Sequence, residues 1–234
     1  IVAIRNGRIL GHIPYKMFVT SFEYKNSKFI INDFVFKQKK DITAAKITAT
    51  ADKYGFSALL NLNDIHISNK KLSGDIKITG KNCENAIEFS AESDNLIFDN
   101  FKNDFFASGK YREDKFEFEK FHYGKLIDGK ASYYIKEKTL NANIKFNMQD
   151  ISFINKNVSG MVAGNAKVSG KTDDLIVFAD YIYKNGNIYG LPCYGGGKIS
   201  YQAGTVKAED THFNLAGAAL NISGNAELTK KSFL

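Results

Sequence analysis

The chain has 234 residues, 44% hydrophobic and 24% charged, which allows one large domain or two smaller ones and excludes a disordered or fibrous protein. The formal net charge is +7 and the pI is near 9.1. Its lysines occur mostly singly, which argues against nucleic-acid binding and favours a solvated face with at most weak attraction to anionic lipid headgroups. No apolar run reaches the roughly 18 residues of a membrane-spanning helix, and no signal peptide is visible.

The first 60 residues contain dense aromatic segments, FVTSFEY and FIINDFVF, followed by ITATADKYGFSALLNL. Phe34 and Phe36 share one parity, as do Ile47 and Ala49, and such alternation predicts strands of about five to eight residues. Turn signals at Asn26-Ser27 and Tyr54-Gly55 separate these segments.

The central part of the chain continues the alternation and breaks it once. In FEFEKFHYG, Phe116 and Phe118 fall on one parity and Phe121 on the other. This change predicts a β-bulge near Glu119 and Lys120.

A short glycine-containing unit recurs along the chain: apolar, any residue, Gly, polar, apolar, polar, apolar. It is clearest at 162–170 (VAGNAKVSG) and at 72–80 (LSGDIKITG), and its glycines lie on the apolar side of the strand. A strand glycine costs roughly 0.5–1 kcal/mol relative to alanine, and it usually marks a bend, a bulge or the close approach of another surface. The unit therefore predicts a sheet that curves at its glycines, with the apolar side inside the curve.

The last third is the most regular part, with hairpin-turn signals at Asn185-Gly186, Gly195 to Gly197 and Ala203-Gly204. No stretch has the apolar spacing of a helix. We therefore predict an all-β fold with almost no helix: a long curved antiparallel sheet of roughly 16 strands, forming an elongated half-pipe (β-taco) groove with an apolar interior. Residues 1–234 are interpreted as one elongated groove segment of a longer protein.

Residues for catalysis or metal binding are not grouped in the sequence. Successive histidines are more than 50 residues apart; they are His12, His66, His122 and His212. The run Gly195 to Lys198 lacks the spacing of a phosphate-binding loop. Cys83 and Cys193 show no metal-ligand spacing and are interpreted as two separate thiols rather than a disulfide. We expect neither an enzyme nor a bound cofactor or metal.

The stretch VSGMVAGNAKVSGKTDDLIVFADYIYKNGNIYGLP, residues 158–192, resembles the repeating pattern of the AsmA-like superfamily, TamB-like members especially. There, strands written G-x-h-x-h-x-G lead through a short turn into a further apolar strand and an asparagine-glycine turn. The match is best over 151–234 and fair over 61–150, whereas only composition supports it over 1–60. Family members often have proline at the position of Leu175.

The resemblance implies a periplasmic groove, anchored to the inner membrane by a segment outside this chain, that carries phospholipid acyl chains toward the outer membrane and supports its integrity. The implied partners are phospholipid and membrane proteins at the groove ends, with no nucleic acid. The expected lipid contacts are the apolar residues of the alternating strands: Ile76, Ile78, Phe116, Phe118, Ile144, Phe146, Met148, Val162, Ala166, Val168, Leu220, Ile222, Ala226 and Leu228.

Alternation alone leaves other interpretations open. The same residues would form the core of a closed sandwich or barrel. A β-solenoid or β-sandwich segment of a surface adhesin would bind through its loops, whereas an outer-membrane barrel would turn its apolar face outward to lipid. A β-jellyroll that carries lipopolysaccharide would be hard to separate by sequence from a phospholipid groove.

Overall fold

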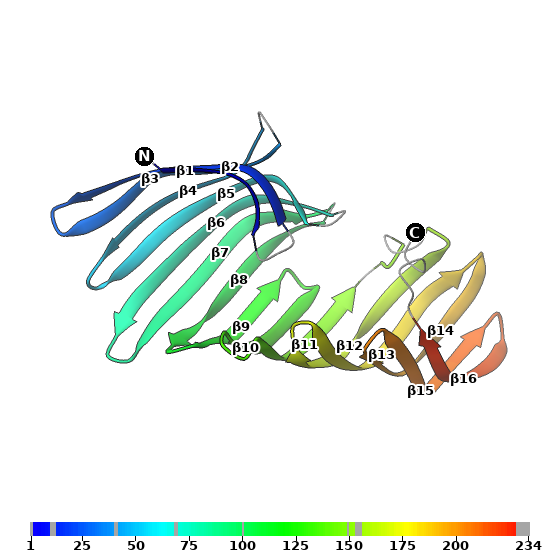
Figure 1. The fold of residues 1–234 in the computed structure, drawn as a ribbon. Coiled ribbons are helices and arrows are strands. Elements are labelled where there is room, and N and C mark those ends of the chain that lie inside the picture. Colours follow the sequence, from blue (N-terminus) through cyan, green and yellow to red (C-terminus); the bar gives the residue numbers. More distant parts are fainter. Residues whose placement is uncertain are drawn as a thin grey trace. The chain divides into compact units, whose positions relative to one another are not determined.

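The computed structural model describes residues 2–9, 13–39, 42–67, 70–99, 101–148, 150–152 and 156–227. The regular secondary structure of these ranges consists of β-strands, and within each of the two units given below they pair antiparallel in sequence order (Figure 1). The expected all-β, antiparallel fold with almost no helix is confirmed. Contacts within the chain divide it into unit 1, Ile1–Glu113, and unit 2, Asp114–Leu234.

Unit 1 is a meander in which each strand turns back on the one before it. Its strands are β1 (Val2–Ile9), β2 (Ile13–Lys25), β3 (Lys28–Lys39), β4 (Ile42–Asp52), β5 (Gly55–Ile67), β6 (Lys70–Cys83), β7 (Ala86–Phe98) and β8 (Phe101–Arg112).

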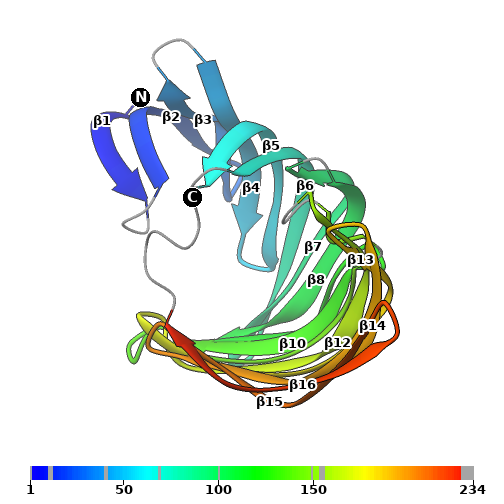
Figure 2. The same cartoon turned by 90° about the vertical axis from the view of Figure 1, so that its right-hand side faces the viewer.

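Unit 2 repeats this arrangement. Its strands are β9 (Lys115–Tyr123), β10 (Ile127–Tyr134), β11 (Thr139–Met148), β12 (Val158–Lys171), β13 (Asp174–Ile188), β14 (Leu191–Gln202), β15 (Thr205–Leu215) and β16 (Ala218–Glu227). Figure 2 shows the strands of unit 2 as arcs, so its sheet is curved along the strand direction.

Two-residue turns join many of the strands. Asn26 and Ser27 both have positive φ, as do Ala203 and Gly204, which is the type I′ geometry that suits the right-handed twist of a hairpin. These two predicted turns are confirmed. The turn expected at Tyr54-Gly55 lies one residue earlier, at Lys53 and Tyr54.

Two other predicted turns are wrong. Asn185 and Gly186 lie within β13, where the register to β14 shifts, and the chain turns at Tyr189-Gly190 instead. Asn185 has a φ of 49°, so the left-handed backbone typical of an Asn-Gly turn serves a bulge here. Gly195 to Gly197 lie inside β14: Gly195 and Gly196 pair with both neighbouring strands, and Gly197 pairs with β13 where the register to β15 shifts.

The predicted bulge in β9 is confirmed. Phe118 pairs with Ala131 and Phe121 with Gly129, so Glu119 and Lys120 together oppose a single residue of β10. The bulge restores Phe121 to the face that carries Phe118, which explains the change of parity in the sequence.

Within each unit, the strands make their main contacts with their neighbours along the chain, so each sheet is a single layer. Small and medium residues dominate the buried apolar set, and no large side chain among the described residues is fully buried. A closed two-layer domain of this size would bury many large side chains completely. The apolar face of each unit is therefore not covered by a second sheet of the same unit.

Candidate functional site

The candidate site is the apolar face of each sheet, which we call the apolar face of unit 1 and of unit 2. Residues paired across antiparallel strands point to the same side of the sheet. In unit 1, Ile76 pairs with Leu60, and Ile78 pairs with Ala58 and Ala91. One cross-strand row on this face runs from β2 to β8 through Phe22, Ile31, Ala49, Ala58, Ile78, Ala91 and Ala107.

In unit 2, the register brings the predicted residues of four strands, β9, β11, β12 and β16, onto one face. A single row crosses β9 to β16 through Phe118, Ala131, Ala142, Val168, Val177, Tyr201, Val206 and Ala226. Ile144 pairs with Ala166, and Met148 with Val162, in parallel rows. Phe116, Phe146, Leu220 and Ile222 have the same parity relative to these rows. Leu228 lies outside the described residues.

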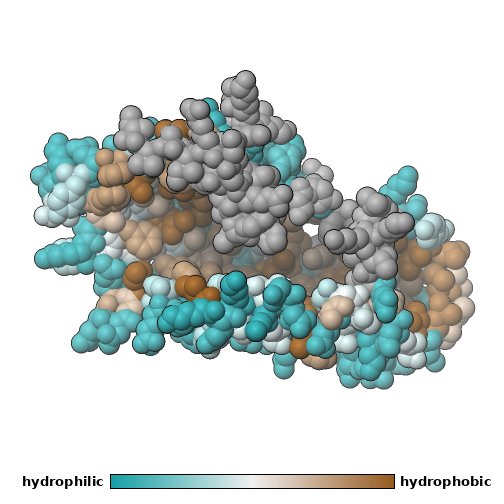
Figure 3. Space-filling model, viewed as in Figure 1, coloured by the Kyte–Doolittle hydropathy of each residue, from teal (hydrophilic) through white to brown (hydrophobic). Residues whose placement is uncertain are grey.

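None of the predicted contact residues that the structure describes is buried. Those on interior strands are half-buried, whereas Leu220 and Ile222 on β16 are 40% and 45% exposed. Figure 3 shows apolar residues gathered within the hollow of the curved sheets, with polar residues along the outside. These side chains form an open surface rather than a sealed core.

Cross-strand pairs of glycine and an aromatic residue build much of this surface. Gly80 pairs with Phe56 and Gly109 with Phe89 in unit 1. In unit 2, Gly164 pairs with both Phe146 and Tyr181. Further pairs are Gly129 with Phe121, Gly195 with Phe213 and Gly197 with Tyr181.

The aromatic rings occupy the space that a side chain at the glycine would fill. A Cβ added at Gly129 would lie 2.6 Å from Cζ of Phe121, and one added at Gly164 would lie 2.8 Å from Cζ of Phe146. Four of these glycines thus let a ring lie across the neighbouring strand: Gly80, Gly129, Gly164 and Gly195. Close approach of another surface is one of the three usual roles of a strand glycine, beside a bend and a bulge. The prediction from the sequence was that the sheet curves at its glycines.

Tyr183 is the most buried ring of the apolar face of unit 2. It packs against the β13 bulge at Gly186, and its hydroxyl donates a hydrogen bond to the carbonyl oxygen of Ser159 at 2.5 Å. Burial and the nearby Cys193 raise the pKa of Tyr183, and burial raises the pKa of the Cys193 thiol. Tyr181 and Tyr183 both contact Phe213, with ring centroids 6.3 and 6.2 Å away.

These aromatic residues were missed as contact residues by the sequence analysis. The signal was present, because Val177, Ala179, Tyr181 and Tyr183 alternate in LIVFADYIY. It was hidden because Ile176, Phe178 and Ile182 make the other face of β13 apolar too. Phe213 could not be assigned to a face, since the register shift between Ala208 and Thr211 is not visible in the sequence.

The opposite face of each sheet is polar and carries cross-strand ion pairs. In unit 1, Lys46 and Asp33 lie 2.6 Å apart, and Lys77 and Glu92 lie 3.2 Å apart. Exposed pairs of this kind contribute about 0–1 kcal/mol each. The pairing supports the interpretation of the scattered lysines as a solvated face.

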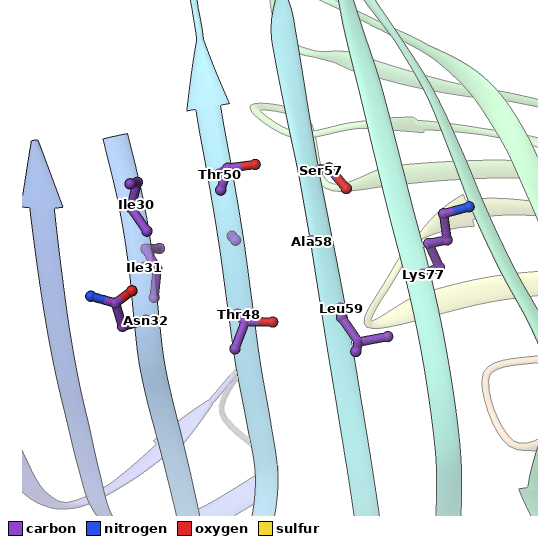
Figure 4. Close-up of a pocket in the computed structure, with 10 residues that line it drawn as sticks. Ile30, Ile31, Asn32, Thr48, Thr50, Ser57, Ala58, Leu59 and Lys77 are labelled. Carbon is purple, nitrogen blue, oxygen red and sulfur yellow. The ribbon is translucent and has the colours of Figure 1, made fainter. Parts of the chain in front are cut away.

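An open hollow of about 460 Å³ lies on this polar face (Figure 4). Ile30, Thr48, Ser57, Leu59 and Lys77 contribute side chains to it from β3, β4, β5 and β6. It lies on the opposite side of the sheet from Ile76 and Ile78. It is therefore not part of the candidate lipid surface.

Groups for metal binding do not assemble in the described ranges: no three His, Cys, Asp or Glu side chains lie close enough to hold an ion. Nδ1 of His212 lies 2.7 Å from Oδ1 of Asn221 on the polar face of unit 2. Cys83 and Cys193 are free thiols, the first exposed and the second buried. His12 lies outside the described residues.

The part of the chain that the structure describes contains no helix capable of crossing a bilayer. No protein-family model, curated protein or solved structure matches the chain.

Proposed function

We propose that this chain is a non-enzymatic groove protein that shields phospholipid acyl chains from water on their way between the inner and outer membranes of a bacterium. One observation carries the proposal. In each unit, a continuous apolar face crosses the sheet, yet its predicted contact residues stay half-buried or exposed. A contiguous uncovered apolar surface of this kind marks an interaction site.

The energetics favour lipid as the occupant. A phospholipid exposes about 30 methylenes at about 0.8 kcal/mol each, so free passage through water costs on the order of 20 kcal/mol. An apolar face removes much of this cost without a catalytic residue. Headgroups can remain in solvent at the open side.

The dimensions also fit an acyl chain. With strands about 4.8 Å apart, the seven strands β2 to β8 extend the apolar face of unit 1 over about 29 Å, and the eight strands of unit 2 extend its face over about 34 Å. One leaflet of a bilayer core is about 15 Å thick, half of the roughly 30 Å hydrocarbon layer. Each unit is therefore long enough to cover one extended acyl chain.

Two alternatives fit these observations less well. A closed sandwich would bury residues such as Ile78 and Val168, which are half-buried here. An adhesin that binds through loops needs longer loops than the two-residue turns at Asn26-Ser27 and Ala203-Gly204.

The proposal also includes a periplasmic location, an inner-membrane anchor outside this chain, and partner proteins at the groove ends.

The test is native mass spectrometry with lipid extraction on protein purified from a bacterial host without detergent. We expect co-purified phospholipid that is lost in Ile78→Asp and Val168→Asp, because a carboxylate on the apolar face disfavours acyl chains. Matched controls are Thr79→Asp and Ser169→Asp, one residue along on the polar face of the same strands. These controls should keep the lipid.

Circular dichroism of the four variants separates loss of binding from loss of fold. Folded apolar-face variants without lipid, beside lipid-bound controls, support the proposal. A lipid-free wild type, or folded apolar-face variants with undiminished lipid, would overturn it.

A further inference from the structure

Two neighbouring hairpin tips of unit 1 expose large aromatic rings. Tyr24 precedes the β2–β3 turn and is 72% exposed; Tyr54 lies in the β4–β5 turn and is 69% exposed. Both tips lie on the same edge of the sheet, because alternate turns of a meander share an edge (Figure 1). Exposed rings of this size rarely gather on a soluble surface without a partner.

Four hydrogen bonds fix the backbone of the turn that carries Tyr54. Oδ1 of Asp52 accepts hydrogen bonds from the backbone N–H of Tyr54 at 2.8 Å and of Gly55 at 3.2 Å. Asn82 on β6 donates its backbone N–H to the carbonyl oxygen of Tyr54 and its side-chain amide to that of Lys53, at 2.8 and 2.9 Å. A hydrogen-bonded turn thus presents the Tyr54 ring to solvent.

The rings at the β2–β3 tip continue the apolar face of unit 1. Tyr24 pairs with Phe29, and Phe29 pairs with Ala51, which pairs with Phe56. Phe22 stacks on Phe29 with ring centroids 5.5 Å apart, and both are exposed. The apolar face therefore continues to this edge of the sheet.

Lysines lie beside the rings. Lys25 and Lys28 flank the first turn, and Lys53 places its Nζ 4.8 Å from the centroid of the Tyr54 ring. Lys81 pairs with Gly55 next to the second turn. The nearby carboxylates are Glu23, Asp52, Glu84 and Glu88, the cross-strand partner of Lys81. Glu88 also pairs with Lys110 at 3.3 Å, so five lysines and four carboxylates leave a local excess of one positive charge.

We propose that these two hairpin tips dock unit 1 onto the surface of an anionic lipid bilayer. Tyrosine rings favour the boundary between headgroups and acyl chains, and lysines favour anionic headgroups. The rings carry most of the interaction, since the net charge of the tips is small. The proposal stands independently of lipid carriage, although the unbroken apolar face at this edge offers acyl chains a path from the bilayer.

The experiment is co-sedimentation of the full chain with vesicles of phosphatidylcholine alone and of phosphatidylcholine with phosphatidylglycerol at about 3:1. The double variant Tyr24→Ser/Tyr54→Ser should lose about tenfold in partitioning, because two partly inserted rings lose their apolar contact. Lys53→Gln should reduce the preference for the anionic vesicles by about fivefold, the effect of one basic residue near the surface.

The matched control is Tyr189→Ser in the β13–β14 turn of unit 2. Tyr189 is 73% exposed, but its hairpin tip, from Asn187 to Pro192, contains no lysine. This variant should bind vesicles like the wild type. Circular dichroism checks the fold of each variant. If the double variant is unfolded, Tyr54→Ser alone replaces it, and its partitioning onto vesicles should fall by about threefold.

Absence of wild-type binding to anionic vesicles would overturn the proposal, and so would equal losses in the unit 1 and unit 2 variants. The same samples are analysed for co-purified phospholipid. Lipid retained by a protein that does not bind vesicles would refute membrane docking but not lipid carriage. Vesicle binding by a lipid-free protein would refute lipid carriage but not membrane docking.

Discussion

Unit 1 and unit 2 have the same meander and the same division into an apolar and a polar face, but they build the apolar face from different side chains. In unit 1, the central strands present large aliphatic residues such as Leu60, Leu62, Ile76 and Ile78. In unit 2, the central strand β12 presents Gly164 and Ala166. Rings from neighbouring strands cover the space that these small residues leave.

The difference shows that hydrophobic alternation specifies a face but not how closely the backbones and rings pack on it. In unit 1, a side chain mostly fills the space above its own strand, and Gly55 and Gly80 are exceptions at which a Cβ would meet a neighbouring strand or ring. In unit 2, the close approach of neighbouring strands and rings depends on the absence of a Cβ at several positions. Unit 2 should therefore tolerate fewer substitutions at its glycines.

The largest expected difference concerns Gly164→Ala in unit 2. The new Cβ would overlap the carbonyl oxygen of Asp180, a backbone atom that cannot move independently of β13. We expect the free energy of unfolding to fall by about 1–3 kcal/mol, the usual cost of overpacking. Urea denaturation followed by circular dichroism measures the change.

The matched substitution in unit 1 is Gly80→Ala, for which the three atoms nearest the new Cβ all belong to the ring of Phe56. That ring can rotate aside, and alanine gains about 0.5–1 kcal/mol over glycine in a strand. The net change should be within about 0.5 kcal/mol. Equal losses at Gly80 and Gly164 would contradict the proposed difference between the units.

The second prediction compares the two thiols. Cys83 in unit 1 is exposed, whereas Cys193 in unit 2 is buried and has a raised pKa, which lowers its thiolate fraction at a given pH. Reaction with a disulfide reagent at pH 8 should modify Cys83 at least about 100-fold faster, since Cys193 reacts only after local opening. Cys83→Ser assigns the fast phase, and similar rates for both thiols would show that β14 opens readily.

The smallest effect is an alkaline loss of stability specific to unit 2. The pKa of Tyr183 is raised in the folded state, so its contribution is fully present below the unfolded value near 10. As the pH rises from that value through the folded pKa, ionisation favours the unfolded state, and stability falls by at most about 1.4 kcal/mol per pH unit.

Tyr183→Phe removes this dependence and costs about 1 kcal/mol for the lost hydrogen bond to Ser159. Val177→Ala, on the same strand and face, lowers stability without removing a titrating group. Urea denaturation between pH 8 and 11 should show a shallower slope for Tyr183→Phe only. An unchanged slope would mean that Tyr183 ionises as easily folded as unfolded.

Much of the fold could be predicted from the sequence because a strand has a side-chain period of two. Alternation in VAGNAKVSG and LSGDIKITG identified the apolar faces, and the parity change around Glu119 identified the β9 bulge. Local turn signals were less reliable. The Asn185-Gly186 pair has the backbone preference of a turn, but the same preference suits the bulge against β14.

The sequence by itself determined that the chain forms antiparallel strands and which residues of most strands share a face, because these depend on local alternation. Only the tertiary structure decided that the apolar face is uncovered within each unit and which ring lies over which glycine. These features depend on the register between strands, and bulges such as the one between Ala208 and Thr211 change that register without a local signal. An exposed apolar face and a buried core share one alternating pattern, so the packing of the folded sheet alone distinguishes them.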